Sequence, residues 1–361
     1  MLHKEFEIAV NKVPEEQRKE KPAQDQLGFG QYYADHMFSM RWNREHGWHD
    51  AQIQPYANIA LDPAAMVFHY GQAIFEGMKV YRSQDGHIFL FRPQDNFARM
   101  NQSALRMCMP RFPEEKVLQA LKALVYLDQD WVPSEPGATL YVRPTMIATE
   151  PHLGLRAAEE YLFYIINSPV GAYYSEGFSP TRIYVEETSV RAVPGGVGFA
   201  KTSGNYAASL KAQVEAHEKG FTQVLWLDAI EHTYIEEVGT SNIFFVINDV
   251  LITPPLGGSI LPGVTRDSVI ELAREWDIPV EERRLSIVEV IKAAEDGSLQ
   301  ESFGTGTAAV ISPIGELNYR AAAYTIGDGR IGPLAQRFYD AIQGIQFGAR
   351  EDTHEWVVSV C

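Results

Sequence analysis

The sequence predicts an α+β protein built from two domains. The chain has 361 residues, a length typical of two domains. Strand-like and helix-like runs are mixed along it without the regular βαβ alternation of a doubly wound sheet. A stretch rich in Gly, Ser and Pro, GAYYSEGFSP at 171–180, interrupts these runs near the middle. We therefore expect an N-terminal domain at 1–172, a connection or lid at 173–181 and a C-terminal domain at 182–361.

Composition excludes several classes of protein. Apolar residues make up 45% of the chain and charged residues 22%, which is ordinary for a globular protein. The formal net charge of −16 argues against nucleic-acid or anionic-membrane partners, because phosphate groups would be repelled. The two cysteines, Cys108 and Cys361, provide no disulfide framework, and no metal site is expected. The N-terminus lacks the apolar core of a signal peptide and no run is long enough to cross a membrane, so we expect a cytoplasmic protein.

The N-terminal half alternates strand and helix patterns. Its first thirty residues are polar and are expected to cover the surface. MKVYR and HIFLF flank the turn Ser83-Gln84-Asp85-Gly86 and predict a hairpin. The remaining predictions are a helix at 93–107, a second helix after Pro113, and strands at 138–148 and 160–170.

The C-terminal half has the same mixed pattern. We predict strands at 224–228, 241–247 and 250–253, the last two as a hairpin around Asn248-Asp249. Helices are predicted at 266–276, from the capping box Ser286–Glu289 to Gly297, and at 333–345.

Lys201 is the first candidate for chemistry. It is the only charged residue between Arg191 and Lys211, among small and apolar residues. A lysine in such a setting can be desolvated enough to act as a nucleophile. An exposed lysine on a glycine-rich loop is the alternative explanation.

Four further features could bind or stabilise charge. Of the adjacent acids Glu236 and Glu237, which precede an apolar strand, at most one faces a given site. The turns at 261–265 and 304–309 can present backbone N–H groups to an anion, although a capped helix start and a tight turn explain them equally. The second turn matches G-x-G-x-x-A, but it lacks the βαβ context of a dinucleotide site. Arg99 lies beside the apolar stripe of its predicted helix, and Arg143 lies within an apolar strand run, where a charge needs a partner. A structural arginine held in a salt bridge is the alternative explanation for both.

Seven segments together resemble the branched-chain amino-acid aminotransferases, which are class IV, fold-type IV enzymes that use pyridoxal 5′-phosphate (PLP). They occur in the family's order and span most of the chain. The segments are HYGQAIFEGMKVYR (69–82), FRPQDNFARM (91–100), YVRPTMIAT (141–149), GGVGFAKTSGNYAASL (195–210), EEVGTSNIFF (236–245), ILPGVTRDSV (260–269) and GTGTAAVISP (304–313). The resemblance implies two α+β domains with an active site between them.

The resemblance also implies the residues that bind the cofactor. Lys201 would be the catalytic Schiff-base lysine, Glu237 would face the pyridine nitrogen, and Tyr206 would bind the phenolic oxygen. The other implied cofactor-binding residues, several of them around the phosphate, are Arg99, Thr240, Asn242, Leu261, Gly263, Val264, Thr265 and Thr307.

The implied reaction is the reversible transfer of the amino group of L-leucine, L-isoleucine or L-valine to 2-oxoglutarate, giving L-glutamate and a 2-oxo acid. Phe29, Tyr70, Phe75 and Tyr141 would line the side-chain pocket. Arg143 would meet the second carboxylate of glutamate. Backbone N–H groups of Thr307 and Ala308 would hold the α-carboxylate, and Tyr173 would be a lid residue.

Family members form homodimers or assemblies of dimers, and PHLGLR (151–156) lies where the loop that closes the partner's pocket is expected. Three alternatives remain open. A D-amino-acid aminotransferase or an aminodeoxychorismate lyase would share the lysine and the phosphate site. A cofactor-free Schiff-base enzyme would need only the lysine. A non-enzymatic binding protein would lose no activity when Lys201 is replaced.

Overall fold

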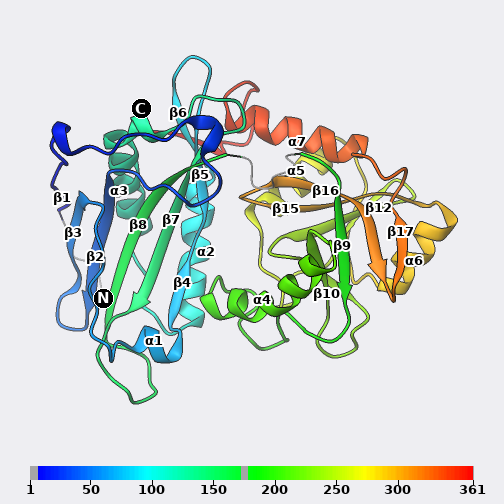
Figure 1. Cartoon of the computed structure of the whole chain (residues 1–361), viewed down its shortest axis with the longest axis horizontal. Coiled ribbons are helices and arrows are strands. Elements are labelled where there is room, and N and C mark those ends of the chain that lie inside the picture. The colour runs from blue at the N-terminus through cyan, green and yellow to red at the C-terminus, as the bar shows by residue number, and fades with distance from the viewer. Residues whose placement is uncertain (1–6, 172–177, 361) are drawn as a thin grey trace. The chain divides into compact units, whose positions relative to one another are not determined.

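The computed structural model describes residues 7–171 and 178–360. The described chain forms two compact units. The first holds residues up to 171 together with 200–203 and 344–360; the second holds 178–199 and 204–343. Helices and strands alternate irregularly in both units, so the predicted α+β class is confirmed (Figure 1).

The units differ from the predicted domains in two segments. Residues 200–203 pack with the first unit because Phe75 N donates to Lys201 O and Thr202 pairs with Ile74. Residues 344–360 do so because a C-terminal strand joins the first sheet. The predicted boundary at 173–181 stays a prediction, since it lies largely outside the described residues.

The first unit is built on one sheet, in which all strand pairs are antiparallel except β1 with β3. The strand order is β1-β3-β2-β8-β7-β5-β6-β18, and β4 also pairs with β7. The strands are β1 (Ala9–Val10), β2 (His36–Asn43), β3 (Gly47–Pro55), β4 (Ala73–Phe75), β5 (Met78–Arg82), β6 (Ile88–Phe91), β7 (Thr139–Ala148), β8 (Glu160–Val170) and β18 (Val357–Ser359).

The first unit has three α-helices and three 3₁₀ turns among the described residues, and the predicted helices α2 and α3 build its core. These elements are α1 (Met66–Tyr70), α2 (Pro93–Arg106), α3 (Glu114–Leu127), η1 (Glu15–Gln17), η2 (Gln24–Gln26) and η3 (Gln129–Trp131). Phe97, Met100 and Ala104 form the fully buried stripe of α2, which packs with α3 over one sheet face (Figure 1).

The alternation along β7 decides which side chains can serve a site. Leu140, Val142 and Met146 are fully buried in the core beneath the helices. Tyr141 and Arg143 lie between them in sequence and therefore point to the opposite face of the sheet. This face carries most of the candidate residues of the first unit.

The strands β2 and β3 were not predicted. The first five residues of β2 are all buried, so its sequence lacks the period-two pattern that marks a half-exposed strand. The N-terminal segment is tied to β2 by His36, whose Nε2 accepts from Val13 N at 2.8 Å while Nδ1 contacts Asp128 Oδ1 at 2.6 Å. Because Nε2 accepts a backbone N–H, the ring proton lies on Nδ1, facing Asp128.

The second unit contains a mixed sheet with the order β11-β10-β9-β16-β15-β12-β13-β14, and β17 also pairs with β16. Its strands are β9 (Thr181–Glu186), β10 (Gln223–Leu227), β11 (Ile235–Val238), β12 (Asn242–Ile247), β13 (Val250–Thr253), β14 (Val280–Glu282), β15 (Leu299–Gly306), β16 (Val310–Tyr319) and β17 (Ala322–Thr325). The remaining helices are α4 (Ser203–Glu218), α5 (Val264–Glu275), α6 (Ile287–Asp296) and α7 (Pro333–Gln346).

In this half the sequence predicted β10, β12, β13, α5, α6 and α7, but it did not predict α4 or the strands β9, β11, β14, β15, β16 and β17. Asn248 and Asp249 have φ values of 50° and 61°, as a tight hairpin turn requires. Ser286 Oγ accepts from Glu289 N at 3.1 Å, which confirms the capping box at the start of α6. Helix α4 was missed because its buried residues are Ala, Ser and Asn, which give no apolar stripe.

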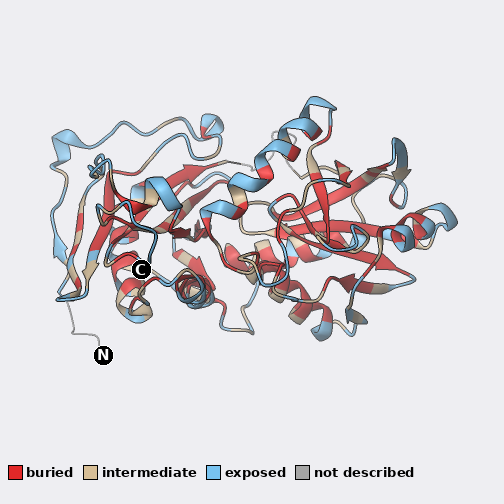
Figure 2. Ribbon diagram, turned by 90° about the horizontal axis from the view of Figure 1, so that it is seen from below, coloured by how far each residue is buried: buried red, intermediate tan, exposed pale blue. Residues whose placement is uncertain are grey.

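The C-terminal strand β18 is a further element that the sequence did not reveal. It pairs with β6, and Arg92 N donates to Trp356 O at 2.7 Å just before it. Figure 2 shows the strands of both sheets largely buried, with exposed residues on the outer sides of helices and in loops. None of the helices in the described part of the chain combines the length and apolar character needed to cross a bilayer.

Lys79 on β5 is a buried lysine on the face that also carries Tyr141, its partner in the ladder. Burial lowers the pKa of Lys79 to about 8, from an ordinary value of 10.5. Below pH 8 the side chain is protonated in both the folded and the unfolded chain, and folding must bury the charge. Between pH 8 and 10.5 the unfolded chain holds more protons, so raising the pH removes a folding penalty of up to about 3 kcal/mol.

We therefore predict that the wild type gains stability relative to Lys79→Met as the pH rises from 7.5 to 9.5, a range that ends below the ordinary pKa of 10.5. Thermal unfolding of both proteins across this range checks the prediction. Titrations elsewhere in the chain are common to both proteins and cancel in the difference. Parallel pH profiles would contradict it.

Candidate functional site

Lys201 lies on a short segment that the first unit holds by its backbone. Lys201 N donates to Ser103 Oγ at 2.9 Å, and its carbonyl accepts from Phe75 N at 3.0 Å. The next residue is fixed as well, since Thr202 Oγ1 donates to Ala73 O at 2.8 Å. Lys201 Nζ lies 5.1 Å from the centre of the Phe75 ring. The backbone of the candidate nucleophile is therefore held against β4 and α2.

Arg99 lies one turn before Ser103 on α2 and forms a buried ion pair. Its Nε and Nη2 donate to the two carboxylate oxygens of Glu76, each at 2.8 Å. Glu76 is fully buried and also accepts from Gly77 N at 3.1 Å. Ser103 Oγ donates to Arg99 O at 3.1 Å, so Arg99 and Lys201 are linked through one hydroxyl. A two-point contact fixes the guanidinium plane, as recognition of a phosphate requires.

Four predicted pocket residues lie together on the face of the first sheet that carries Tyr141 and Arg143. The rings of Phe29 and Tyr141 are 5.0 Å apart, edge to face. Arg143 Nη2 donates to the Tyr141 hydroxyl at 3.1 Å, and its guanidinium carbon lies 4.9 Å from the Phe75 ring centre. Because Phe75 also touches Lys201, the aromatic group and the lysine form one continuous set. It combines apolar surface with two basic side chains, Arg143 and Lys201.

Tyr70 differs from these residues. It is 37% exposed at the end of α1, and its hydroxyl donates to Leu153 O in the 151–156 segment. A backbone bridge between Ala65 and Pro151 places that segment along α1. The described contacts of Tyr70 therefore belong to the edge of the first unit.

Glu237 is the buried acid of the second unit. It is 2% exposed, and one oxygen lies 2.6 Å from Arg191 Nη1. The other oxygen accepts from Asn242 Nδ2 at 3.2 Å. The neighbouring Glu236 binds Ser259 Oγ instead. A carboxylate held by a buried guanidinium and an amide is stabilised in its ionised form, which suits a protonated ring nitrogen.

The start of α5 lies beside this acid. Asn242 Nδ2 also donates to Leu261 O at 2.9 Å, which ties β12 to the loop before the helix. Gly263 is the N-cap residue and provides no side-chain cap. A Cβ at Gly263 would overlap the Asn242 carboxamide oxygen, so this close approach requires glycine. Val264 and Thr265 form the first turn, where backbone N–H groups favour an anion.

The third anion-binding candidate is the turn between β15 and β16. Thr307, Ala308 and Ala309 connect the two strands, and Gly306 pairs with Val310 across them. Val310 has φ of 63°, a costly left-handed conformation for a β-branched residue. Strain of this kind concentrates at ligand sites, so the turn is a better candidate than its composition alone indicated.

Three predicted residues remain less defined. Tyr206 lies in the first turn of α4. Thr240 is exposed in the tight turn between β11 and β12, next to Gly239, whose φ is 56°. Tyr173 lies outside the described residues.

Sequence reasoning missed the partners of the two predicted charges. Glu76 and Arg191 each complete a buried ion pair, with Arg99 and Glu237 respectively. Glu76 lies within the segment 69–82, and the placement of Arg99 beside the apolar stripe of α2 could have prompted a search for an acidic partner. Arg191 had no such local signal, because only the fold brings it to Glu237.

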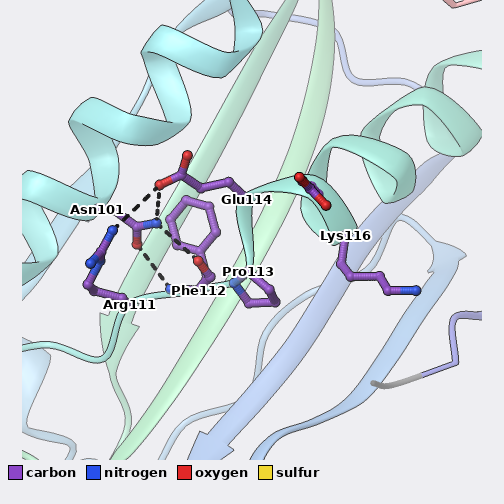
Figure 3. A pocket seen from close by; sticks show the side chains of 7 residues that line it. Asn101, Arg111, Phe112, Pro113, Glu114 and Lys116 are labelled. Atoms are coloured by element: carbon purple, nitrogen blue, oxygen red, sulfur yellow. Dashed lines mark hydrogen bonds and ion pairs between the residues drawn. The ribbon is translucent and has the colours of Figure 1, made fainter. Parts of the chain in front are cut away.

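A surface pocket elsewhere on the first unit contains none of the predicted residues. It lies between α2 and α3 and is lined by Asn101, Arg111, Phe112, Pro113, Glu114, Glu115 and Lys116 (Figure 3). Asn101 is its buried polar residue, and its amide is used by Phe112 N, Phe112 O and Glu114 Oε1. The pocket's polar groups therefore stabilise the α2–α3 connection.

Comparisons with known proteins identify the family. The family model described as amino-transferase class IV matches residues 73–317. Branched-chain-amino-acid transaminase 1 of Bacillus subtilis (strain 168) is 56% identical over 356 residues, covering 97% of this chain and all of the relative. A probable branched-chain-amino-acid aminotransferase of Staphylococcus aureus (strain N315) is 51% identical over 353 residues, 98% of each chain.

Solved structures give the same result. A branched-chain amino acid aminotransferase of Escherichia coli superposes with a TM-score of 0.76 at 28% identity, covering 91% of this chain and 99% of that one. A branched-chain amino acid aminotransferase of Thermobaculum terrenum in its PLP form has a TM-score of 0.72 at 25% identity, covering 91% and 98%. The chain thus belongs to the class IV aminotransferases, and within them to the branched-chain-amino-acid aminotransferase family.

Proposed function

We propose that this protein is a branched-chain-amino-acid aminotransferase that transfers the amino group of L-leucine, L-isoleucine or L-valine to 2-oxoglutarate. One observation carries the proposal. The backbone of Lys201 is fixed by two hydrogen bonds, and its side chain lies beside the Phe75 ring, which Arg143 also contacts. This combination fits a reaction in which one pocket accepts both an aliphatic side chain and a carboxylate. The family supports the same conclusion.

Class IV aminotransferases use PLP, and the residues present fit this group. The buried Glu237–Arg191 pair suits a pyridine nitrogen, and the glycine-capped start of α5 suits a phosphate. When bound, PLP supplies an electron sink that makes the substrate Cα–H acidic. Lys201, Arg99, Glu237, Asn242, Leu261, Gly263, Val264, Thr265 and Thr307 would hold it.

Lys201 would also move the proton. Its Nζ would carry the proton between the substrate Cα and C4′ of the cofactor, in either direction, so it must reach both carbons without reorganisation. The two backbone hydrogen bonds of Lys201 and the ring of Phe75 limit its freedom in this way. Glu237 would keep the ring nitrogen protonated through charge, with Arg191 keeping Glu237 ionised.

Substrate recognition would use two regions. Phe29, Phe75 and Tyr141 provide apolar contact for a branched side chain, and Arg143 turns toward the second carboxylate of glutamate. Backbone N–H groups of Thr307 and Ala308 would hold the α-carboxylate. The proposed contacts of Tyr70, Tyr206, Thr240 and Tyr173 rest on the family resemblance alone.

The half-reaction tests this function directly. Purified protein supplied with PLP should show a visible absorption band, which L-leucine converts to a near-ultraviolet band and 2-oxoglutarate restores. Lys201→Ala should lose this conversion, with a fall in rate of several orders of magnitude, because both the cofactor attachment and the proton acceptor are removed.

Lys211→Ala is the matched control, since Lys211 is an exposed lysine on α4. It should leave the spectrum and the conversion unchanged. A visible band that responds to D-alanine or to aminodeoxychorismate but not to L-leucine would keep the cofactor and overturn the substrate assignment. Absence of a visible band in cofactor-supplied wild type would overturn the function.

We further propose a homodimer and a cytoplasmic location. Three large apolar side chains, Phe68, Leu153 and Leu155, here called the patch, are 61%, 64% and 82% exposed. Their two segments are joined by the Ala65–Pro151 bridge and by the hydrogen bond from Tyr70 to Leu153 O. Exposed apolar side chains on linked segments favour association. The patch includes the 151–156 segment, and a second copy of the chain is its proposed occupant. The location rests on the sequence alone.

Leu155→Asp should therefore shift the protein from dimer toward monomer at micromolar concentration, because a charge would be buried in the interface. Light scattering after size-exclusion chromatography measures this. Leu105→Asp on α2 is the control, since Leu105 is 64% exposed at a place outside the patch. Equal masses for the wild type and both variants would contradict the proposed interface.

A further inference from the structure

Thr305 on β15 has a buried hydroxyl whose hydrogen-bonding capacity the described residues do not satisfy. The residue is 2% exposed, and its Oγ1 has no hydrogen-bond partner among the described residues. Two buried hydroxyls of the same sheet are satisfied: Thr253 Oγ1 donates to Ile243 O at 2.8 Å, and Ser302 Oγ donates to Phe244 O at 2.9 Å. A buried polar group without a partner is costly, and such groups often serve a ligand.

The ladder register places this hydroxyl. Thr305 is opposite Asn242 in the β12–β15 pair, so the two side chains share one face of the sheet about 5 Å apart at Cβ. The Asn242 amide reaches from that face to Leu261 O and lies against Gly263, the N-cap of α5. The helix itself packs on β15. Thr305 therefore lies on the side of the sheet where α5 begins.

We propose that the Thr305 hydroxyl donates a hydrogen bond to the phosphate group of the cofactor at the start of α5. The inference rests on the proposed function and adds a phosphate ligand to the residues assigned above. The first turn of α5 and the turn at 307–309 offer backbone donors, and a glycine N-cap offers no side chain. A neutral hydroxyl supplies a further donor without adding a buried charge that would itself need a partner.

Comparing the binding of PLP with that of pyridoxal, which lacks the phosphate, separates phosphate binding by the Thr305 hydroxyl from a purely structural role. Full-length protein freed of cofactor is titrated with each compound, and binding is followed by visible absorbance. Thr305→Val keeps the shape and removes the donor. This substitution should lower the affinity for PLP about tenfold or more, which is the effect expected for a lost hydrogen bond to a charged group. It should leave the affinity for pyridoxal unchanged. Thr305→Ser keeps the donor and should restore PLP affinity.

Thr253→Val is the matched control, because it removes a buried hydroxyl of the same sheet whose bond to Ile243 O is internal. It should lower thermal stability without separating PLP from pyridoxal. If valine is not accommodated at position 305, Thr305→Ala repeats the comparison. Wild-type PLP affinity in the variants, or equal loss for PLP and pyridoxal, overturns the inference. Failure of the wild type to bind PLP overturns the proposed function instead.

Discussion

The arrangement of the first unit depends on how the backbone of residues 200–203 is held. Both backbone polar groups of Lys201 are used by α2 and by the residue that ends β4, and Thr202 adds a third bond to the same strand. These contacts fix a segment that lies far along the chain, and they restrict where the Lys201 side chain can reach. Ser103 extends the constraint to Arg99, and Phe75 extends it to Arg143. These contacts thus fix four candidate site residues relative to one another: Arg99, Lys201, Phe75 and Arg143.

Buried charge is handled in the same way in both units. Arg99 with Glu76, and Arg191 with Glu237, are ion pairs in which every member is at least nine-tenths buried. Desolvation offsets most of the attraction in such pairs, so they contribute little net stability. What they provide is a fixed orientation of the guanidinium and carboxylate groups. In a chain with a net charge of −16, each of these two buried arginines has a carboxylate partner within its own unit.

Much of the fold was predictable because its local signals are strong. The apolar stripe of α2, the Asn248-Asp249 hairpin and the Ser286 capping box are each set by neighbours in the sequence. Helix α4 and strand β2 lack such periodicity, since the first buries small residues and the second is buried on both faces. The candidate lysine, acid and turns were found from composition and resemblance. Arg191 and Thr305 were not, because only the register and packing of distant strands give them a role.

The path of the chain has a consequence for synthesis. The chain builds most of the first unit, enters the second, returns at 200–203, leaves again and comes back at 344. Strand β18, which adds to the edge of the first sheet at β6, is the final one made. A ribosome therefore releases the last part of the first unit only after the whole second unit has been translated. A fragment that ends before residue 200 therefore lacks the lysine segment, and one that ends before residue 357 leaves the β6 edge of the first sheet without β18.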